Sequence, residues 1–423
     1  MLQINYIREN KEDVLARLSK KNFKQLELVD EILDLDHKRR STQAQLDNVL
    51  SQSNTMAKSI GELVKSGRKE EIEKIKETTS LLKEDIKTLG EELAELEQLV
   101  HNKLVQLPNL PHASVPVGST PEENDVVLTH GAIPSLPEGA LPHWELAAKY
   151  DIIDFELGNK ITGAGFPVYK GKGAKLQRAL INFFLDNANE LGYKEVQPPV
   201  LINEASGFGT GQLPDKEGQM YHVTEDNLYL IPTAEVPVTN LYRDEIVKEE
   251  DLPIKNTAYT PCFRREAGSY GAHVRGLNRL HQFDKVEIVQ IVHPEKSYET
   301  LEEMSTYIQS LLQKLELPYR VLRLCGGDMS FTSALTYDME VYSAAQGRWL
   351  EVSSASNFET FQSNRLKLRF RGKEGKPQLA HTLNGSALAL PRIVASLLEN
   401  NQTEKGIKIP AALVPYTGFE YID

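Results

Sequence analysis

The sequence predicts an α+β fold in which a long antiparallel α-helical hairpin, forming a coiled-coil arm, precedes an antiparallel β-sheet domain flanked by helices. Proline is absent before Pro108, and only three glycines occur in that stretch. Apolar residues recur there at spacings of three and four, which is typical of paired helices. Beyond residue 142, strand-like runs occur without a regular βαβ alternation, which favours an antiparallel sheet.

The length and composition restrict the class of protein. The chain has 423 residues, whereas single cores stop growing near ~250–300 residues, so two domains are expected. No apolar run approaches the ~20 residues of a membrane span, and charged residues interrupt the start before a signal-peptide core could form. Cys262 and Cys325 lie far apart, without the spacing of a disulfide framework or a thiolate zinc site. These features predict a cytoplasmic protein with no membrane partner and no zinc.

Residues 1–107 are predicted to form the helical arm. The second helix carries a heptad seam over four repeats: Ile72, Ile75, Thr79, Leu82, Ile86, Leu89, Leu93, Leu96 and Val100. A looser seam in the first helix is Val29, Ile32, Asp36, Arg39, Gln43, Leu46, Leu50, Ser53, Ala57 and Ile60. Ser66-Gly67 marks a turn between them. Helices of ~35 residues give an arm on the order of 50 Å long, which should project from a globular domain.

Basic residues gather near the predicted end of the arm and further along it. They are Lys58, Lys65, Arg68 and Lys69, followed by Lys38, Arg39 and Arg40. A run of charge is most often a solvated helix face. Lysine and arginine on a projecting arm are nevertheless the best candidates for phosphate contacts with a nucleic acid. The net charge of −12 argues against a protein coated in basic surface but leaves such a local patch open.

A proline-rich stretch over residues 108–142 predicts an irregular linker, and residues 143–423 form the second domain. Ala174–Leu191 reads as an amphipathic helix that Gly192 stops. The strand-like runs are Val196–Ile202, Leu228–Ile231, Tyr259–Glu266, Leu280–Val292 and Trp349–Ser353. The second domain carries neither a Walker A nor a Rossmann glycine pattern, so any nucleotide would have to be bound in another way.

The segment Cys262–Glu287 carries the most chemical information. If its two strand-like runs pair, Phe283 and Glu287 share one face about 13 Å apart. An aromatic ring can stack on adenine, a carboxylate can hold an ammonium or hydroxyl group, and Arg264 between them can grip a phosphate bidentately. This arrangement favours activation of an amino acid with ATP, by positioning and electrostatic stabilisation. An ordinary hairpin with surface Arg/Glu pairs remains an equal alternative on spacing alone.

Five motifs resemble those of class II aminoacyl-tRNA synthetases and, more narrowly, of the bacterial-type seryl-tRNA synthetase family. They are Gly192–Pro199, Thr233-Ala234-Glu235, Phe263-Arg264-Arg265-Glu266, Glu351-Val352-Ser353-Ser354 and Asn384–Arg392. The resemblance covers essentially the whole chain, including the helical arm. It implies a class II catalytic domain over residues 143–423, with Gly192–Pro199 at the interface of a homodimer.

The resemblance also implies roles for individual residues. ATP-binding positions would be Arg264, Arg265, Glu266, Arg279, Leu280, Phe283, Glu351, Val352, Ser353, Ser354 and Arg392. Serine-binding positions would be Thr233, Ala234, Glu235, Arg264, Glu287, Asn384 and Ser386. Arg264, Arg392 and Glu351 would be catalytic, while Glu351 and Ser354 would hold Mg²⁺. Pro391 is tolerated in the first turn of a helix, so we expect the helix that carries Arg392 to start at about Ala387–Leu390.

The implied reaction is that of a serine–tRNA ligase. L-Serine would be activated with ATP to seryl-adenylate, releasing pyrophosphate, and transferred to the 3′ end of serine tRNA, and of selenocysteine tRNA where that tRNA exists. One alternative is a synthetase-like ligase that loads a carrier protein, although such relatives lack the long arm. Another is a non-enzymatic coiled-coil protein on a degenerate domain, against which the retained Arg264, Glu266, Phe283, Glu287, Glu351 and Arg392 weigh heavily.

Overall fold

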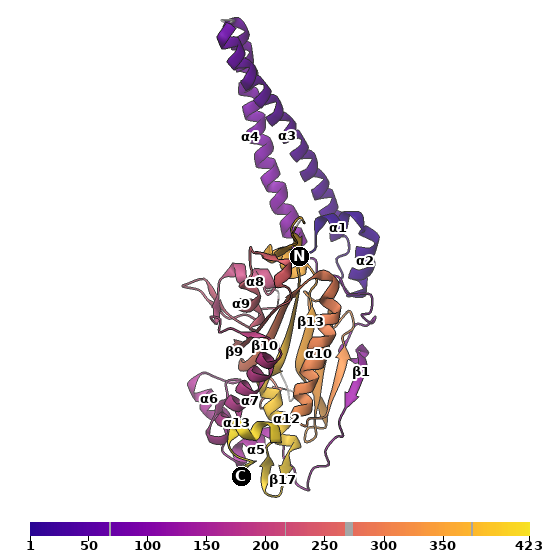
Figure 1. Ribbon diagram of the computed structural model, residues 1–423, viewed down its shortest axis with the longest axis vertical. Coiled ribbons are helices and arrows are strands. Elements are labelled where there is room, and N and C mark those ends of the chain that lie inside the picture. The colour runs from indigo at the N-terminus through magenta and orange to yellow at the C-terminus, as the bar shows by residue number, and fades with distance from the viewer. Residues whose placement is uncertain (67–68, 216, 267–273, 374) are drawn as a thin grey trace. The chain divides into compact units, whose positions relative to one another are not determined.

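A computed structural model of the protein describes residues 1–423 apart from 67–68, 216, 267–273 and 374, and the side chains of 61–72 and 74 also lie outside the described part (Figure 1). The chain divides into two compact units. The first comprises Met1–Ser19 and Phe23–Pro108, and the second comprises Lys20–Asn22 and Asn109–Asp423. Among the described residues, no helix has both the length and the apolar character needed to cross a membrane.

The first unit contains a pair of long helices, α3 (Leu28–Ser66) and α4 (Lys69–Leu104), that run side by side in opposite directions (Figure 1). Two short helices, α1 (Ile4–Glu9) and α2 (Lys11–Lys20), precede them. The predicted helical hairpin is therefore confirmed. Every residue of the predicted α4 seam from Ile75 to Val100 is buried or partly buried, while Ile72 lies outside the described side chains.

The predicted seam of α3 is wrong at two positions of its second half, whereas Leu46, Ser53 and Ile60 are partly buried as predicted. Leu50 and Ala57 are exposed, whereas Val49 and Met56 are partly buried. Positions 46, 49, 53, 56 and 60 follow the same alternation of three and four residues as the predicted set, but in the opposite phase. The polar middle of this helix offered too few apolar residues to fix that phase from the sequence.

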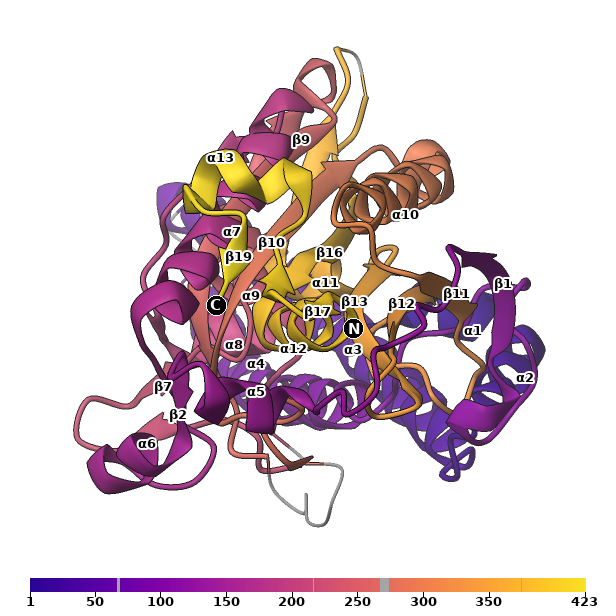
Figure 2. The ribbon, with the colours of Figure 1, turned by 90° about the horizontal axis from the view of Figure 1, so that it is seen from below.

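The second unit is built on an eight-stranded sheet in the order β1-β11-β12-β13-β16-β10-β9-β4. The strands are β1 (Asp125–His130), β4 (Lys194–Glu195), β9 (Ile254–Phe263), β10 (Gln282–Val292), β11 (Tyr319–Arg323), β12 (Leu335–Ser343), β13 (Arg348–Asn357) and β16 (His381–Ala389). All neighbouring pairs are antiparallel except β4 with β9. The predicted α+β class with an antiparallel sheet is therefore confirmed (Figure 2).

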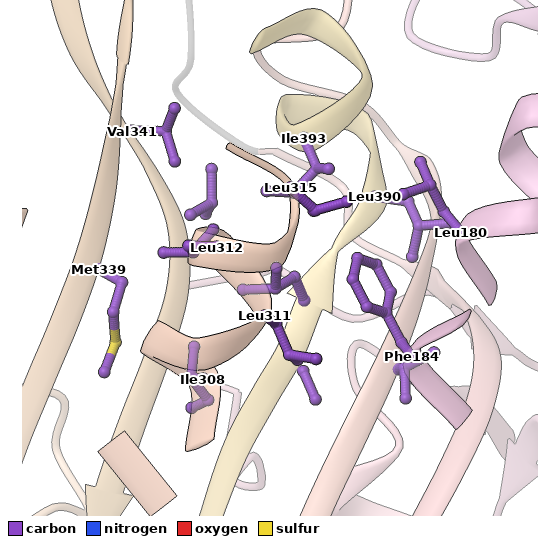
Figure 3. Packing of buried hydrophobic residues seen from close by; sticks show 14 of the residues in the cluster. Leu180, Phe184, Ile308, Leu311, Leu312, Leu315, Met339, Val341, Leu390 and Ile393 are labelled. Carbon is purple, nitrogen blue, oxygen red and sulfur yellow. The ribbon is translucent and has the colours of Figure 1, made fainter. Parts of the chain in front are cut away.

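Three helices supply most of the core that packs against this sheet: α7 (Gly171–Glu190), α10 (Ser297–Lys314) and α12 (Leu390–Asn400). Figure 3 shows their apolar side chains meeting those of β12. The participants include Leu180 and Phe184 from α7, Ile308, Leu311 and Leu312 from α10, Leu390 and Ile393 from α12, and Met339 and Val341 from β12. Burial of this apolar surface holds α12 on the sheet, and Arg392 lies in the first turn of that helix.

Several predicted boundaries differ from the structure. Residues 108–142 were expected to be an irregular linker, yet Asp125–His130 forms the edge strand β1, which pairs with β11. The expected strand Val196–Ile202 is split into β4 and β5 (Leu201–Ile202), because Pro198 and Pro199 cannot donate ladder hydrogen bonds. Helix α7 begins at Gly171 rather than Ala174.

The remaining expected strands are present with shifted ends. β7 (Leu228–Leu230) lies in a small separate sheet, and β9 ends at Phe263 rather than continuing to Glu266. β13 extends to Asn357, four residues beyond the expected end. The strands β11, β12 and β16 were not expected, although each contributes to the central sheet.

A short segment near the start of the chain belongs to the second unit. Lys21 Nζ donates a hydrogen bond to the Ser333 carbonyl at 2.7 Å, and Asn22 Nδ2 donates to the Gly118 carbonyl at 3.1 Å. A side chain at Gly326 would place its Cβ only 1.9 Å from the Lys20 carbonyl oxygen. The strip Lys20–Asn22 is thus fitted tightly into this unit.

Candidate active site

A cavity of about 360 Å³ opens over the middle of the central sheet. Fifteen of the predicted site residues line it: Thr233, Glu235, Arg264, Glu266, Arg279, Leu280, Phe283, Glu287, Glu351, Val352, Ser353, Ser354, Asn384, Ser386 and Arg392. Arg265 and Ala234 are absent from this lining. Strands β10, β13 and β16 and the start of α12 therefore bring together segments that lie far apart in the sequence.

Strand β10 places three side chains on the cavity side by simple alternation: Phe283, Lys285 and Glu287. The antiparallel register puts Phe283 opposite Cys262 of β9. Because β9 ends at Phe263, alternation along that strand does not set the directions of the Arg264 and Glu266 side chains. Both side chains nevertheless line the cavity, beyond the end of the strand.

One end of the cavity combines an aromatic ring with arginines. The Arg264 guanidinium lies 5.3 Å from the centroid of the Phe283 ring. Glu266 adopts a positive φ of 50° and forms an ion pair with Arg279. The Arg265 side chain is exposed, and its backbone N–H donates to the Gln219 carbonyl at 2.9 Å. Arginine beside an aromatic face suits a nucleotide, whose base can stack and whose phosphates can accept hydrogen bonds.

The other end is a buried ionic cluster. Lys285 Nζ lies 2.6 Å from Glu287 Oε2 and donates to Thr233 Oγ1 at 2.8 Å. Both members of this ion pair are buried, at 5% and 2% exposure. Ser386 Oγ donates to Glu287 Oε2 at 3.4 Å. This end therefore offers carboxylate and hydroxyl oxygens in a desolvated setting, where an unmatched ligand would leave polar groups unpaired.

Glu235 adds a second buried carboxylate to this cluster. Burial and, next, the charge of the nearby Glu287 raise the pKa of Glu235 to about 7, while the hydrogen bond from Gln362 opposes the shift. Gln362 Nε2 donates to Glu235 Oε1 at 2.6 Å. A carboxylate with a pKa near neutrality, held beside another carboxylate, is suited to receive a cationic group from a ligand.

Arg392 lies where the first turn of α12 meets β13. The helix begins at Leu390 with Pro391 in its first turn, which confirms the predicted start. Arg392 Nε donates to the Asn278 carbonyl at 3.0 Å, and Nη1 donates to the Glu351 carbonyl at 2.7 Å. These two contacts fix the guanidinium at the cavity wall, on the side of Glu351.

The residues near Glu351 fit a hard divalent cation such as Mg²⁺. The Glu351 carboxylate is half exposed, and its nearest cation is Arg392 at 3.7 Å. Asp338, opposite Ser354 on β12, has a buried Oδ1 that finds no hydrogen-bond partner among the described residues. Burial, and next the Glu351 charge, raise the pKa of Asp338. Crowded oxygen ligands of this kind are those that Mg²⁺ prefers. Within the described part of the chain, no three His, Cys, Asp or Glu side chains form a metal-binding group.

Sequence reasoning missed ten residues of the lining: Gln212, Leu277, Asn278, Lys285, Ser330, Thr332, Ser356, Phe358, Ala389 and Pro391. Alternation along the strand places Lys285 on the same face as Phe283 and Glu287, although it was not among the predicted site residues. Ser330 and Thr332 come from a stretch without a recognisable motif or strand, so only the fold brings them to the cavity.

The basic residues of the first unit are in differing situations. Arg39 and Arg40 contact the buried Asp36 carboxylate at 2.8 and 3.1 Å, and Arg8 contacts it at 3.1 Å. Lys38 and Lys58 are exposed. Arg68 and the side chains of Lys65 and Lys69 lie outside the described residues. Arg39 and Arg40 of the predicted nucleic-acid patch are thus engaged in ion pairs within α3, with a carboxylate that also contacts Arg8 of α1.

Comparisons with known proteins agree over the length of the chain. Residues 1–111 match the family model of the seryl-tRNA synthetase N-terminal domain, and residues 221–401 match the class II tRNA synthetase core domain (G, H, P, S and T). A serine–tRNA ligase from Salinibacter ruber is 52% identical, covering 100% of this chain and 99% of the relative. One from Akkermansia muciniphila is 47% identical with the same coverage. The crystal structure of seryl-tRNA synthetase from Pyrococcus horikoshii complexed with ATP is similar, with a TM-score of 0.94, 34% identity and 99% coverage of both chains.

Proposed function

The chain belongs to the seryl-tRNA synthetase family, and from this premise we propose how its cavity carries out the reaction. The protein is a serine–tRNA ligase, an ATP-dependent class II aminoacyl-tRNA synthetase that activates L-serine and transfers it to tRNA. The observation that carries the proposed arrangement is the polarity of the cavity. It has an aromatic ring with arginines at one end and buried carboxylates with a lysine at the other.

ATP occupies the end formed by Phe283 and Arg264. The adenine ring stacks on Phe283, Glu266 accepts a hydrogen bond from its amino group, and Arg279 and Arg392 hold the phosphate tail. Arg264 lies near enough to Phe283, at 5.3 Å from the ring centroid, to reach the α-phosphate of a nucleotide stacked there. It stabilises the charge that develops as the serine carboxylate attacks phosphorus and pyrophosphate leaves.

Serine occupies the end formed by Glu235, Glu287 and Ser386. Glu235 attracts the ammonium group. The Glu287 carboxylate accepts a hydrogen bond from the serine hydroxyl, and the Ser386 hydroxyl donates one to it. Thr233 and Asn384 complete this end, with Ala234 carrying the backbone between Thr233 and Glu235. Alanine would leave the buried oxygens of Glu287 and Ser386 unpaired, and such a loss supports strong discrimination. Lys285 holds Glu287 in place at 2.6 Å.

Glu351 and Ser354 are the residues that would hold Mg²⁺, with Asp338 beside them. When bound, the ion would neutralise phosphate charge and orient the pyrophosphate leaving group. Val352, Ser353 and Leu280 line the same cavity. Ser353 Oγ donates to the Ser386 carbonyl at 2.6 Å.

The further partners follow from the helical hairpin and the family. The hairpin of α3 and α4 favours serine tRNA as the acceptor over a carrier protein, and selenocysteine tRNA is a second acceptor where it exists. Lys38, Lys58, Lys65, Arg68 and Lys69 are the proposed phosphate contacts. Arg39 and Arg40 are weaker candidates, because Asp36 already engages them. The enzyme acts as a cytoplasmic homodimer through Gly192–Pro199.

The first test of this proposal is ATP–pyrophosphate exchange with each of the twenty amino acids. Serine alone should support exchange, and a stronger response to any other amino acid would overturn the assignment of the carboxylate end. The exchange should require Mg²⁺, and Glu351→Ala should raise the Mg²⁺ concentration that gives half-maximal rate. An unchanged Mg²⁺ requirement would place the ion elsewhere.

The second test separates activation from transfer. Deleting Val29 to Val100, with a short turn in their place, should preserve serine-dependent exchange and abolish charging of serine tRNA. Charging at the rate of the intact protein would show that the hairpin is not the tRNA-binding element. Charging of a carrier protein in place of tRNA would instead support the alternative ligase.

A further inference from the structure

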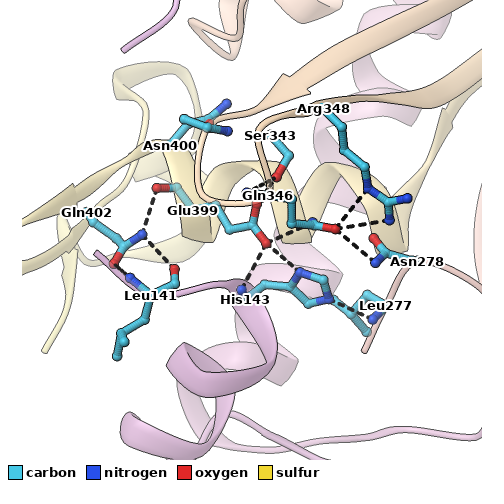
Figure 4. Close-up of polar contacts among 11 residues, drawn as sticks. Leu141, His143, Leu277, Asn278, Ser343, Gln346, Arg348, Glu399, Asn400 and Gln402 are labelled. Carbon is cyan, nitrogen blue, oxygen red and sulfur yellow. Dashed lines mark hydrogen bonds and ion pairs between the residues drawn. The ribbon is translucent and has the colours of Figure 1, made fainter. Parts of the chain in front are cut away.

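A buried network centred outside the cavity joins His143 to two segments that carry cavity residues (Figure 4). These segments are Leu277–Asn278 and helix α12. The centre of the network is the pair His143 and Glu399, both completely buried, with His143 Nδ1 2.6 Å from Glu399 Oε1. His143 lies at the start of α5 (His143–Lys149), and Glu399 lies in the last turn of α12. The cavity lining includes neither residue. The roles proposed above do not use this pair.

The hydrogen-bond pattern selects the tautomer of the His143 imidazole. The Leu277 backbone N–H donates to His143 Nε2 at 2.8 Å, so Nε2 must carry a lone pair. The ring proton is therefore on Nδ1, where it is donated to Glu399. The His143 backbone N–H donates to the same Glu399 oxygen at 2.9 Å. The ring is held on both sides, because Nδ1–H donates to Glu399 and Nε2 accepts from the Leu277 N–H. These two hydrogen bonds fix its orientation.

The network continues from Glu399 to the cavity wall. Gln346 Nε2 donates to Glu399 Oε1 at 3.0 Å, and Asn278 Nδ2 donates to Gln346 Oε1 at 3.0 Å. The Asn278 carbonyl accepts from Arg392 Nε at 3.0 Å. Leu277 and Asn278 are thus held from two sides, immediately before Arg279. The network therefore reaches Arg392 through a hydrogen bond and Arg279 through the peptide chain, and these are the two arginines that we assign to the phosphate tail.

Gly276 shows how closely the chain passes the imidazole. Its φ is +67°, and a Cβ placed there would lie 2.2 Å from His143 Nε2. On the other side, the Trp144 ring meets His143 edge to face, with centroids 4.9 Å apart. His143 therefore has no room to take another orientation without displacing Gly276 or Leu277.

We propose that His143 is a positioning residue for ATP, which acts through Leu277, Asn278 and Glu399 to place Arg279 and Arg392 against the β- and γ-phosphates. This inference rests on the proposed function, because it uses the tail-binding role of the two arginines. It adds to that function a residue on a different helix that contacts neither substrate. Shifts of about 1 Å in a positioned group can cost up to ~100-fold in rate, so the effect should be measurable.

The variants follow from the two hydrogen bonds of the ring. In His143→Asn the amide nitrogen can replace Nδ1 toward Glu399, but nothing reaches the Leu277 N–H. In His143→Gln the side-chain oxygen can replace Nε2 and accept from that N–H. Gln346→Ala breaks the bridge between Glu399 and Asn278 at a half-buried position, so it tests the network even if the histidine variants fail to fold. His381→Asn is a control, because His381 is a partly buried histidine that contacts Ser297 at 2.7 Å, outside the cavity lining.

The readout compares nucleotides with and without the phosphate tail. In serine-dependent exchange, His143→Asn and Gln346→Ala should raise KM for ATP by about 10-fold or more, and change KM for serine by less than about twofold. Calorimetry should show ATP affinity falling by the same factor while AMP affinity stays constant. His143→Gln should recover most of the loss, and His381→Asn should resemble the wild type.

Two outcomes would overturn the inference. Equal losses of ATP and AMP affinity would indicate a general structural role, and unchanged ATP affinity in both His143→Asn and Gln346→Ala would remove the network from ATP binding. Failure of the proposed function is distinguishable, since the unaltered enzyme would then show no serine-dependent exchange at all.

Discussion

Glu235→Gln isolates the charge of the buried carboxylate proposed to receive the serine ammonium group. The substitution keeps size and shape, and the new side-chain oxygen can still accept from Gln362 Nε2, now 2.6 Å from Glu235 Oε1. In the wild type, the pKa of Glu235 is raised to about 7, mainly by burial. The carboxylate therefore changes from neutral to charged within the range in which the enzyme can be assayed.

The expected effect on activity is a pH dependence that the variant lacks. The kcat/KM for serine reports ionisations of the free enzyme. With a pKa of about 7, the charged fraction of Glu235 falls roughly tenfold between pH 8 and pH 6, and kcat/KM for serine should fall with it. Glu235→Gln should be low and flat over that range. The kcat/KM for ATP, measured in the same buffers, serves as the control for ionisation of the phosphates.

The same shift predicts that the variant is more stable at high pH. The folded protein holds the proton with a pKa of about 7, against the ordinary glutamate value of 4.5. Stability from the protonated form is present below pH 4.5 and is lost as the pH rises through 7, by about 3 kcal/mol in total. Glu235→Gln avoids that loss, so chemical unfolding at pH 8 should show the variant to be the more stable, with little difference near pH 5. A flat wild-type profile, or a variant less stable at pH 8, would refute this reasoning.

Three further predictions concern other residues. Arg264→Ala should abolish serine-dependent exchange, whereas Arg265→Ala, at an exposed neighbour outside the cavity lining, should retain it; equal losses in the two variants would contradict the assignment. Lys285→Met should inactivate exchange and destabilise the protein by about 3 kcal/mol or more. The reason is that Glu287 would remain buried without the ammonium group that lies 2.6 Å from it. A stable, active variant would show that the pair is dispensable. Asp36→Ala should lower the unfolding temperature of the first unit, since it leaves three arginines without their shared carboxylate; circular dichroism would detect this loss of helix, and an unchanged transition would show that those ion pairs contribute nothing.

The sequence was informative where local periodicity determines the structure. Alternation along β10 placed Phe283 and Glu287 on one face, and the seam of α4 was found because its apolar residues are regular. The phase of α3 was wrong because the polar middle of that helix left neighbouring registers equally plausible. Arg265 was placed in the site by its motif, yet the chain leaves β9 at Phe263 and turns its side chain to solvent.

Contacts between distant segments were beyond such reasoning. His143 and Glu399 are 256 positions apart in the chain, and no spacing rule connects them. Glu235 could be named from its motif, but its raised pKa depends on burial and on Glu287 from another strand. Pairings of this kind arise only when the sheet and α12 are assembled, because each residue is unremarkable in its own local sequence.

The assignment of Lys20–Asn22 to the second unit means that the helical hairpin is topologically an insertion rather than an appendage. Of the three peptide junctions between the two units, those before Phe23 and after Pro108 flank the hairpin. Exchange of hairpins between related enzymes should therefore be made at two junctions that leave Lys20–Asn22 intact. A single truncation before Asn109 would also remove Lys21, which donates to the Ser333 carbonyl. Such a truncation would therefore damage the second unit as well as remove the first.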